Sequence, residues 1–286
     1  MKSLRNWLVL VFVVFVWGSN WPIMKTSLTF VGPLSLAVQR ATVSFLALLP
    51  FVINARKRLP RDRGTITNLL ILALANIVAI VPQYIALLYE TSGISAVLNY
   101  TQPLFVFLLS VLFLNSKPSR VSVAGGLTGF LGVAVLSLGE TRSFGEIAWY
   151  PIALLITGAF FWAVTIVYYK KKLTHVDPTS INALQQVMSI IVVTPIALRT
   201  EGPSLPLSLS YALMLLYLAV FGSAIAQNLW FWLLKEEDVT VVASSTFLIP
   251  LIAVVLGWLI LGERLTMAPI IGIILILSGI YLVHQP

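Results

Sequence analysis

Polar and aromatic side chains inside long apolar stretches are the groups of this chain that could do chemistry. Trp17 and Asn20 share a helical face with Met24, and Asn76 shares one with Gln83, seven residues later. Polar groups are costly at such places and need a reason. We therefore predict a solute-binding site formed by residues that combine polarity or ring surface with mid-stretch positions: Trp17, Asn20, Arg40, Gln83, Tyr84, Asn99, Tyr100, Trp162, Gln227, Trp230 and Thr246. The rings would suit an amphipathic or aromatic solute, or would serve packing and the membrane interface.

Prolines beside these residues predict flexible points. A proline lacks a backbone donor and frees a carbonyl one turn back in a helix. Asn99 and Thr246 stand one turn before two of the prolines, and the predicted hinges are Pro22, Pro82, Pro103 and Pro250. A hinge next to a site at mid-membrane is expected of a carrier. The alternative is a kink that fits neighbouring helices, with each polar side chain satisfied locally.

Cations near or within the apolar stretches allow two interpretations. Arg40 lies seven residues after Pro33, about 10 Å along a helix. It could bind a substrate carboxylate or brace the helices by bonding to carbonyls, since a charge at that depth needs a partner. Lys25 and Lys170 each lie at the end of an apolar stretch, at opposite faces of the membrane, and are interpreted as interfacial anchors.

The sequence does not place the side chains that ion coupling, hydrolysis or thiolate metal binding would need. The ten carboxylates all fall between the stretches or at their ends, so ion coupling through an embedded acid is unsupported. The two histidines, His175 and His284, also lie at ends, and the chain has no cysteine. A serine hydrolase, an intramembrane aspartyl protease or a thiolate metal site therefore lacks its parts. We expect no enzyme activity, no cofactor and no metal.

Composition predicts an all-α integral membrane protein. Hydrophobic residues make up 59% of the chain and charged residues 10%, against roughly 25% charged in soluble domains. A spanning helix needs about 20 apolar residues. Ten spans are expected, at 6–27, 34–54, 66–88, 93–115, 120–139, 148–169, 179–198, 209–234, 240–261 and 267–284. The net charge of +8 comes from basic residues in short loops, which does not indicate nucleic-acid binding.

The chain repeats itself, so we expect two halves, 1–145 and 146–286. Pairs such as Trp17 and Trp162, or Lys25 and Lys170, are offset by 145 positions. A second block, which includes Pro103 with Pro250 and Gly132 with Gly279, is offset by 147. Arg40 has the neutral Gln185 as its counterpart. Five spans per half is an odd number, so the halves would insert with opposite polarity, an arrangement that often accompanies alternating access. The alternative is a duplication that only enlarged the bundle.

Basic residues also predict the orientation. With a cytoplasmic N-terminus, thirteen lysines and arginines fall on the cytoplasmic side and three fall outside: Arg142, Arg199 and Arg264. This bias places both termini in the cytoplasm. A glycine row, Gly125, Gly129 and Gly132, would let helices approach closely and either hold the halves together or form a homodimer face.

The order of motifs resembles the EamA-like branch of the drug/metabolite transporter superfamily. Trp17-Gly18-Ser19-Asn20-Trp21 followed by Lys25 is similar to that family's first helix, and Gln39-Arg40 to its second. Pro250-Leu251 through Gly262-Glu263-Arg264 is similar to its ninth-helix ending. In the first half, Leu114-Asn115-Ser116 stands where the family has Leu-Gly-Glu. The resemblance implies a carrier with ten helices, cytoplasmic termini and a central cavity.

The expected function is a secondary transporter in a bacterial or archaeal inner membrane. It would export small organic solutes, such as amino acids, metabolites or drug-like compounds, by alternating access. Its partners would be the solute, the lipid bilayer and a second copy of the chain. The alternatives are a carrier of anions such as phosphorylated sugars, held by Lys25 and Arg40, and a membrane enzyme, scaffold or sensor without transport. These last would need a catalytic cluster or a soluble domain, which the sequence does not contain.

Overall fold

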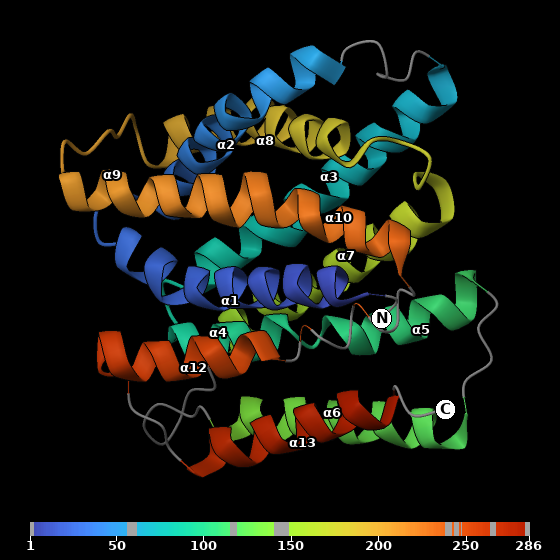
Figure 1. The fold of residues 1–286 in the computed structure, drawn as a ribbon. Coiled ribbons are helices and arrows are strands. Elements are labelled where there is room, and N and C mark those ends of the chain that lie inside the picture. Colours follow the sequence, from blue (N-terminus) through green and yellow to red (C-terminus); the bar gives the residue numbers. More distant parts are fainter. Residues whose placement is uncertain are drawn as a thin grey trace.

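The protein is a bundle of long helices that run roughly side by side (Figure 1). This computed structural model describes residues 3–55, 62–114, 119–139, 149–237, 248–263 and 267–283, together with Val242 and Thr246. No strand occurs among them. Its helices are α1 (Leu4–Ser27), α2 (Pro33–Ala55), α3 (Arg63–Ala86), α4 (Ser92–Asn99), α5 (Gln102–Phe113), α6 (Arg120–Gly139), α7 (Trp149–Lys172), α8 (Pro178–Thr200), α9 (Leu209–Leu216), the π-helix η2 (Tyr217–Ile225), α10 (Ala226–Glu236), α12 (Leu248–Leu261) and α13 (Met267–Val283).

Side-chain caps explain where several helices begin. The Ser3 hydroxyl accepts from the Asn6 backbone N–H at 3.3 Å, and the Asp62 carboxylate accepts from Thr65 N–H at 2.7 Å. Thr91 and Asp177 cap α4 and α8 in the same way. The first N–H groups of a helix have no partner within it, so each such cap stabilises the start of its helix.

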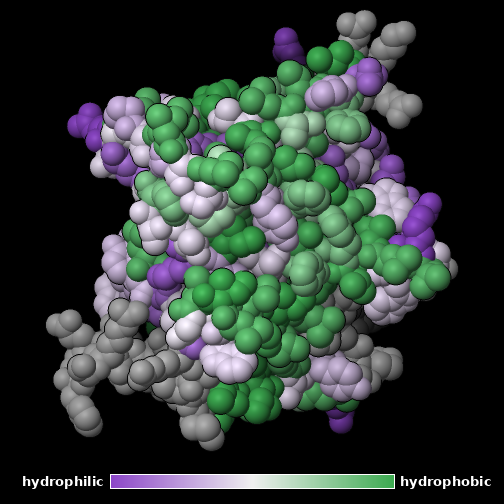
Figure 2. Space-filling model, turned by 60° about the vertical axis from the view of Figure 1, so that its left-hand side comes forward, coloured by the Kyte–Doolittle hydropathy of each residue, from purple (hydrophilic) through white to green (hydrophobic). Residues whose placement is uncertain are grey.

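The all-helical membrane architecture expected from composition is confirmed. Among the described residues, seven helices are long and apolar enough to cross a membrane, counting α4–α5 and α9–η2–α10 as one each. The expected spans 120–139, 240–261 and 267–284 correspond to α6 and to the shorter helices α12 and α13, with most of 240–247 outside the described residues. Apolar side chains cover the middle of the face in Figure 2, with hydrophilic ones toward its left and right margins.

Helices far apart in the sequence pack against one another. The pairs α2–α8, α3–α7 and α6–α13 make extensive contacts, and α1 packs against both α12 and α10. α4 lies against α7 and α12. Figure 1 shows α6 and α13 as a pair at one side of the bundle. The helices that carry the candidate residues thus pack against one another.

The glycine row joins α6 to α13 within the chain. A Cβ built on Gly132 would lie 2.6 Å from the Ile276 nitrogen and 2.9 Å from the Gly272 carbonyl oxygen, and one on Gly279 would collide with the backbone of Gly129. Small residues allow such backbone contact. The glycine row was expected either to hold the halves together or to form a homodimer face. In the structure it mediates the contact between α6 and α13.

Each of the four predicted hinge prolines lies either inside a continuous helix or in the first turn of a helix. Pro22 and Pro82 lie inside the continuous helices α1 and α3. Pro103 and Pro250 instead lie in the first turns of α5 and α12. The expected span 93–115 is interrupted at Tyr100 and Thr101, because Pro103 has no N–H to donate to the Asn99 carbonyl.

The two lysines bind the carbonyl ends of other helices. Their interpretation as interfacial anchors stays a prediction. Lys25 Nζ donates to the carbonyls of Leu87 (2.5 Å) and Glu90 (2.8 Å), just after α3. Lys170 Nζ donates to Leu234 O in α10 at 2.9 Å and to Glu237 O at 3.3 Å. Cations suit these places, since the last carbonyls of a helix lack partners and carry partial negative charge.

Candidate functional site

A central cavity gathers side chains from most of the long helices. Its lining comes from α1, α2, α3, α7, α8, η2 and α10 and from the break between α4 and α5. The polar and aromatic residues among them are Trp17, Asn20, Trp21, Arg40, Asn76, Gln83, Tyr84, Asn99, Tyr100, Gln102, Trp162, Gln185, Gln186, Ser189, Ser223 and Gln227. Polar side chains thus gather with aromatic ones at a cavity inside an otherwise apolar bundle, which is typical of a ligand site.

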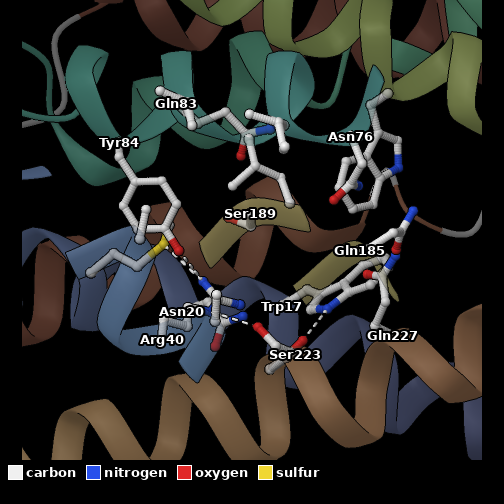
Figure 3. Close-up of a pocket in the computed structure, with 18 of the residues that line it drawn as sticks. Trp17, Asn20, Arg40, Asn76, Gln83, Tyr84, Gln185, Ser189, Ser223 and Gln227 are labelled. Carbon is white, nitrogen blue, oxygen red and sulfur yellow. Dashed lines mark hydrogen bonds between the residues drawn. The ribbon is translucent and has the colours of Figure 1, made fainter. Parts of the chain in front are cut away.

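Arg40 is held on one side of this cavity by neutral acceptors. Its Nε donates to the Ser223 hydroxyl at 2.7 Å, and Nη1 donates to the Tyr84 hydroxyl at 3.0 Å and the Met24 sulfur at 3.2 Å (Figure 3). With the Asn20 amide nitrogen donating to Val16 O at 3.2 Å, the Asn20 oxygen accepts from Arg40 Nη2 at 3.3 Å. These bonds fix the guanidinium at the cavity wall.

The charge of Arg40 stands alone in the lining. No aspartate, glutamate, lysine or histidine is among the cavity-lining residues, all of which are described. Hydroxyl, amide and thioether groups supply dipoles but no counter-charge. The cavity therefore has a positive potential that favours an anionic group, because attraction is strong where water is scarce.

Tryptophans form the apolar wall. Trp17 donates its indole N–H to the Gly222 carbonyl at 3.0 Å. Its ring centre lies 5.8 Å from that of Trp162 in an edge-to-face arrangement and 5.2 Å from that of Trp230. Trp21 meets Tyr100 edge-to-face at 6.4 Å. Such contacts hold the rings in place, so the wall presents a defined surface to a solute.

The π-helix η2 brings backbone into the cavity. Its residues Gly222 and Ser223 line the wall, and π segments are often found at functional sites. The Asn182 amide donates to Ser223 O at 2.9 Å and so anchors η2 to α8. A Cβ at Gly222 would lie 2.6 Å from the side-chain amide of Asn20 and 2.9 Å from Arg40 Nη2, so a glycine is needed for this approach.

Most of the predicted binding residues meet at this cavity. Those that line it are Trp17, Asn20, Arg40, Gln83, Tyr84, Asn99, Tyr100, Trp162 and Gln227. Trp230 is buried behind Trp17, and Thr246 is fully buried but is not part of the lining. Whether any of them binds a solute stays a prediction.

Sequence reasoning did not select several lining residues: Asn76, Gln102, Gln185, Ser189, Gly222 and Ser223. Asn76 shares a face with Gln83, and Gln185 is the counterpart of Arg40, so both carried a usable signal. Ser223 also carried a signal, because it lies one helical turn before Gln227, whereas Gly222 has no side chain that could give one.

The sequence matches the model of the EamA-like transporter family twice, over residues 5–138 and 149–285. The chain belongs to the EamA-like transporter family. The resemblance drawn from the motifs is therefore confirmed. Membership indicates a membrane transporter rather than an enzyme.

Relatives of this EamA-like protein span nearly all of it. It is 33% identical to the uncharacterized transporter YvbV of Bacillus subtilis, over 99% of this chain and 94% of that one. It is 29% identical to the uncharacterized inner membrane transporter YedA of Escherichia coli, over 88% and 81%. A WAT1-related chloroplast protein of Arabidopsis thaliana is 26% identical, over 98% and 70%.

The fold also has a counterpart among solved structures. One crystal structure superposes with a TM-score of 0.73 at 19% identity, covering 98% of this chain and 96% of that chain. At this level of identity the match shows the fold alone. The EamA-like protein is thus a multi-pass helical membrane protein of a transporter family.

Proposed function

We propose that this protein is a secondary transporter that exports small organic solutes by alternating access, with the solute held in the central cavity. The observation that carries the proposal is the cavity itself. Amide, hydroxyl and ring side chains from both halves of the chain converge on it from membrane-length helices. Polar groups at that depth are costly, and in carriers they mark the path of the solute.

The repeat supports alternating access. In the two halves, α1 corresponds to α7, α2 to α8, α3 to α9–η2–α10, α4–α5 to α12, and α6 to α13. The packing follows this correspondence: α2 lies against α8 and α6 against α13, while α3–α7 is matched by α1–α10. With five spans each, the halves would be inverted and could exchange conformations with little change in energy.

The orientation proposed for the chain has both termini in the cytoplasm. Support comes from the excess of lysine and arginine on that side and from the ribbon, in which α1 begins and α13 ends toward the same end of the bundle (Figure 1). The inner membrane is the proposed location. Pro103 and Pro250, in the first turns of α5 and α12, are the proposed hinges.

A carrier of anionic solutes is the second candidate, and Arg40 favours it. Arg40 carries the single full charge of the described lining. Lys25, the other cation suggested for anion binding, donates to carbonyls at the end of α3 instead. One guanidinium balances one negative charge, which suits a carboxylate better than a phosphate dianion.

Counterflow in proteoliposomes tests the function. Purified protein is reconstituted with a metabolite mixture inside, and entry of labelled solutes from outside is measured. We expect exchange of at least one solute, reduced about tenfold by Asn99→Ala or Gln227→Ala, since each removes a polar group worth about 1–3 kcal/mol when buried. Thr128→Ala, on α6 and outside the cavity lining, is the control.

Two results would count against the proposal. Normal exchange by both Asn99→Ala and Gln227→Ala would place the solute elsewhere. Folded protein that exchanges no solute of the mixture would contradict transport.

A further inference from the structure

The cavity has two chemically different ends, and we infer that it selects solutes with one carboxylate at one end and a neutral group that both donates and accepts hydrogen bonds, such as a carboxamide, at the other. This inference rests on the proposed function and names the substrate class of the same cavity. It comes from buried polar atoms that Arg40 does not account for.

The first end is the guanidinium of Arg40. Its four contacts are to neutral atoms, and one of them is the Met24 sulfur, a weak acceptor. Hydrogen bonds between a guanidinium and a carboxylate are roughly twice as strong as neutral ones and form in pairs. A solute carboxylate that displaces the sulfur from Nη1 and the Asn20 oxygen from Nη2 would therefore gain binding energy at this end.

The second end is marked by Gln185, and the lining also holds other amides and an indole with polar atoms that have no hydrogen-bond partner. In the cavity lining, Gln102, Gln185 and Asn99 are 0%, 3% and 4% exposed. Both amide atoms of Gln102, Nε2 of Gln185, Oδ1 of Asn99 and Nε1 of Trp162 have no partner. An unsatisfied buried polar atom costs about 1–3 kcal/mol, so five of them around one cavity need an explanation.

These unpaired atoms define the group that would fit. Gln102, Gln185 and Trp162 offer N–H donors, and Gln102 and Asn99 offer carbonyl acceptors. None carries a charge. A group with its own donor and acceptor satisfies both kinds at once, while a carboxylate would leave the acceptors unpaired and would lose its water without a cation.

The repeat explains why the ends differ. Arg40 on α2 and Gln185 on α8 occupy equivalent positions of the two halves. Figure 3 shows them on opposite sides of the cavity, with Trp17 labelled between them. A scaffold that is symmetric thus carries a charged residue on one side and a neutral amide on the other. The flat Trp17 ring would lie along the middle of the solute.

Competition in the counterflow assay tests this selectivity. The probes are 4-carbamoylbenzoate (both groups), 4-methylbenzoate (anion alone), terephthalamide (amide alone) and terephthalate (two anions). A second set places the same end groups on aliphatic chains of four to six carbons. We expect the carboxylate–amide member of one set to compete at least tenfold better than the other three.

Substitutions at the two equivalent positions give the sharper test. Arg40→Gln should reduce competition by 4-carbamoylbenzoate about tenfold or more and leave terephthalamide unchanged, while Arg40→Lys keeps part of the preference. Gln185→Arg should move the preference to terephthalate, because each end would then carry a cation. Lys171→Gln and Asn68→Leu, which lie outside the cavity lining, are the controls for lost charge and lost amide.

The possible outcomes distinguish a failure of this selectivity from a failure of the proposed transport function. If the protein exchanges solutes but all members of both sets compete equally, or none competes, the inference is overturned and transport stands. The same holds if Gln185→Arg does not favour the dianion. If no solute is exchanged at all, the proposed function fails first.

Discussion

The position of each site residue depends on contacts with other helices rather than on its own stretch of sequence. Arg40 is held by groups from α1, α3 and η2, so its position depends on three helices at once. Trp17 depends on a backbone carbonyl of η2. A change at any of these contacts should therefore alter the site before it alters the fold.

Gly222→Ala tests this at the tightest contact. The added methyl group would meet the Asn20 amide at 2.6 Å and Arg40 Nη2 at 2.9 Å, and both are the ends of side chains that can turn away. We expect thermal stability within a few degrees of the original chain and solute affinity reduced about tenfold. Gly126→Ala, whose methyl would meet Phe107 at an ordinary 3.8 Å, is the matched control. Unchanged affinity in Gly222→Ala would contradict the proposed position of the site.

At the scale of elements, carboxylates from one half bind the helix N-termini of the other. Glu263, just after α12, accepts from Ser92 N–H (2.7 Å), the Ser92 hydroxyl (2.9 Å) and Gly93 N–H (3.2 Å) at the start of α4. Glu201, just after α8, accepts from the N–H groups of Leu34 (2.9 Å) and Ser35 (2.8 Å) in α2. A negative charge at the positive end of a helix is stabilising.

Glu263→Gln and Glu201→Gln should each lower the free energy of unfolding by about 1 kcal/mol, because the amide keeps one acceptor and loses the charge. The losses should add in the double variant, since the two carboxylates bind different helices. Thermal unfolding in detergent measures them. Unchanged stability in the double variant would show that these caps are weak.

The Asp62 carboxylate caps the N-terminus of α3, and its contribution to stability should depend on pH. The Thr65 backbone N–H holds the pKa of this exposed carboxyl below its usual 3.8. A lowered folded-state pKa means that the stabilisation is present above the unfolded value and is lost as pH falls through the folded value. We expect Asp62→Asn to flatten the decrease in melting temperature below pH 4, measured against the original chain. An identical acid profile would contradict a role for this cap.

The positions of the seven long apolar helices and the polar helix faces could be predicted from the sequence, because both follow local periodicity. The repeat also gave Arg40 and Gln185 as a pair. Glu263 could not be assigned a role, since its partners Ser92 and Gly93 are remote in the sequence. Thr246 was included for its symmetry with Asn99, yet side chains at equivalent positions need not both reach the cavity. The carbonyl partners of Lys25 could not be predicted, because the ends of other helices leave no signal in the sequence around it.

At the scale of the whole molecule, two similar halves enclose one polar cavity within an apolar bundle. The family model matches each half, and the counterpart helices pack in corresponding ways. The central claim is that the halves rock around this cavity and expose it to one side of the membrane at a time. Such exposure is measurable, because the chain contains no cysteine and a single one can be introduced.

Labelling of Ser189→Cys with a membrane-impermeant thiol reagent tests this claim most directly. Ser189 lines the cavity from α8, and the substitution changes its volume little. Oriented vesicles are labelled from each side, with and without a solute that the protein exchanges. We predict that the solute shifts reactivity from one side of the membrane to the other. Labelling that stays on one side whatever solute is present, or that proceeds equally from both sides through an open pore, would contradict alternating access.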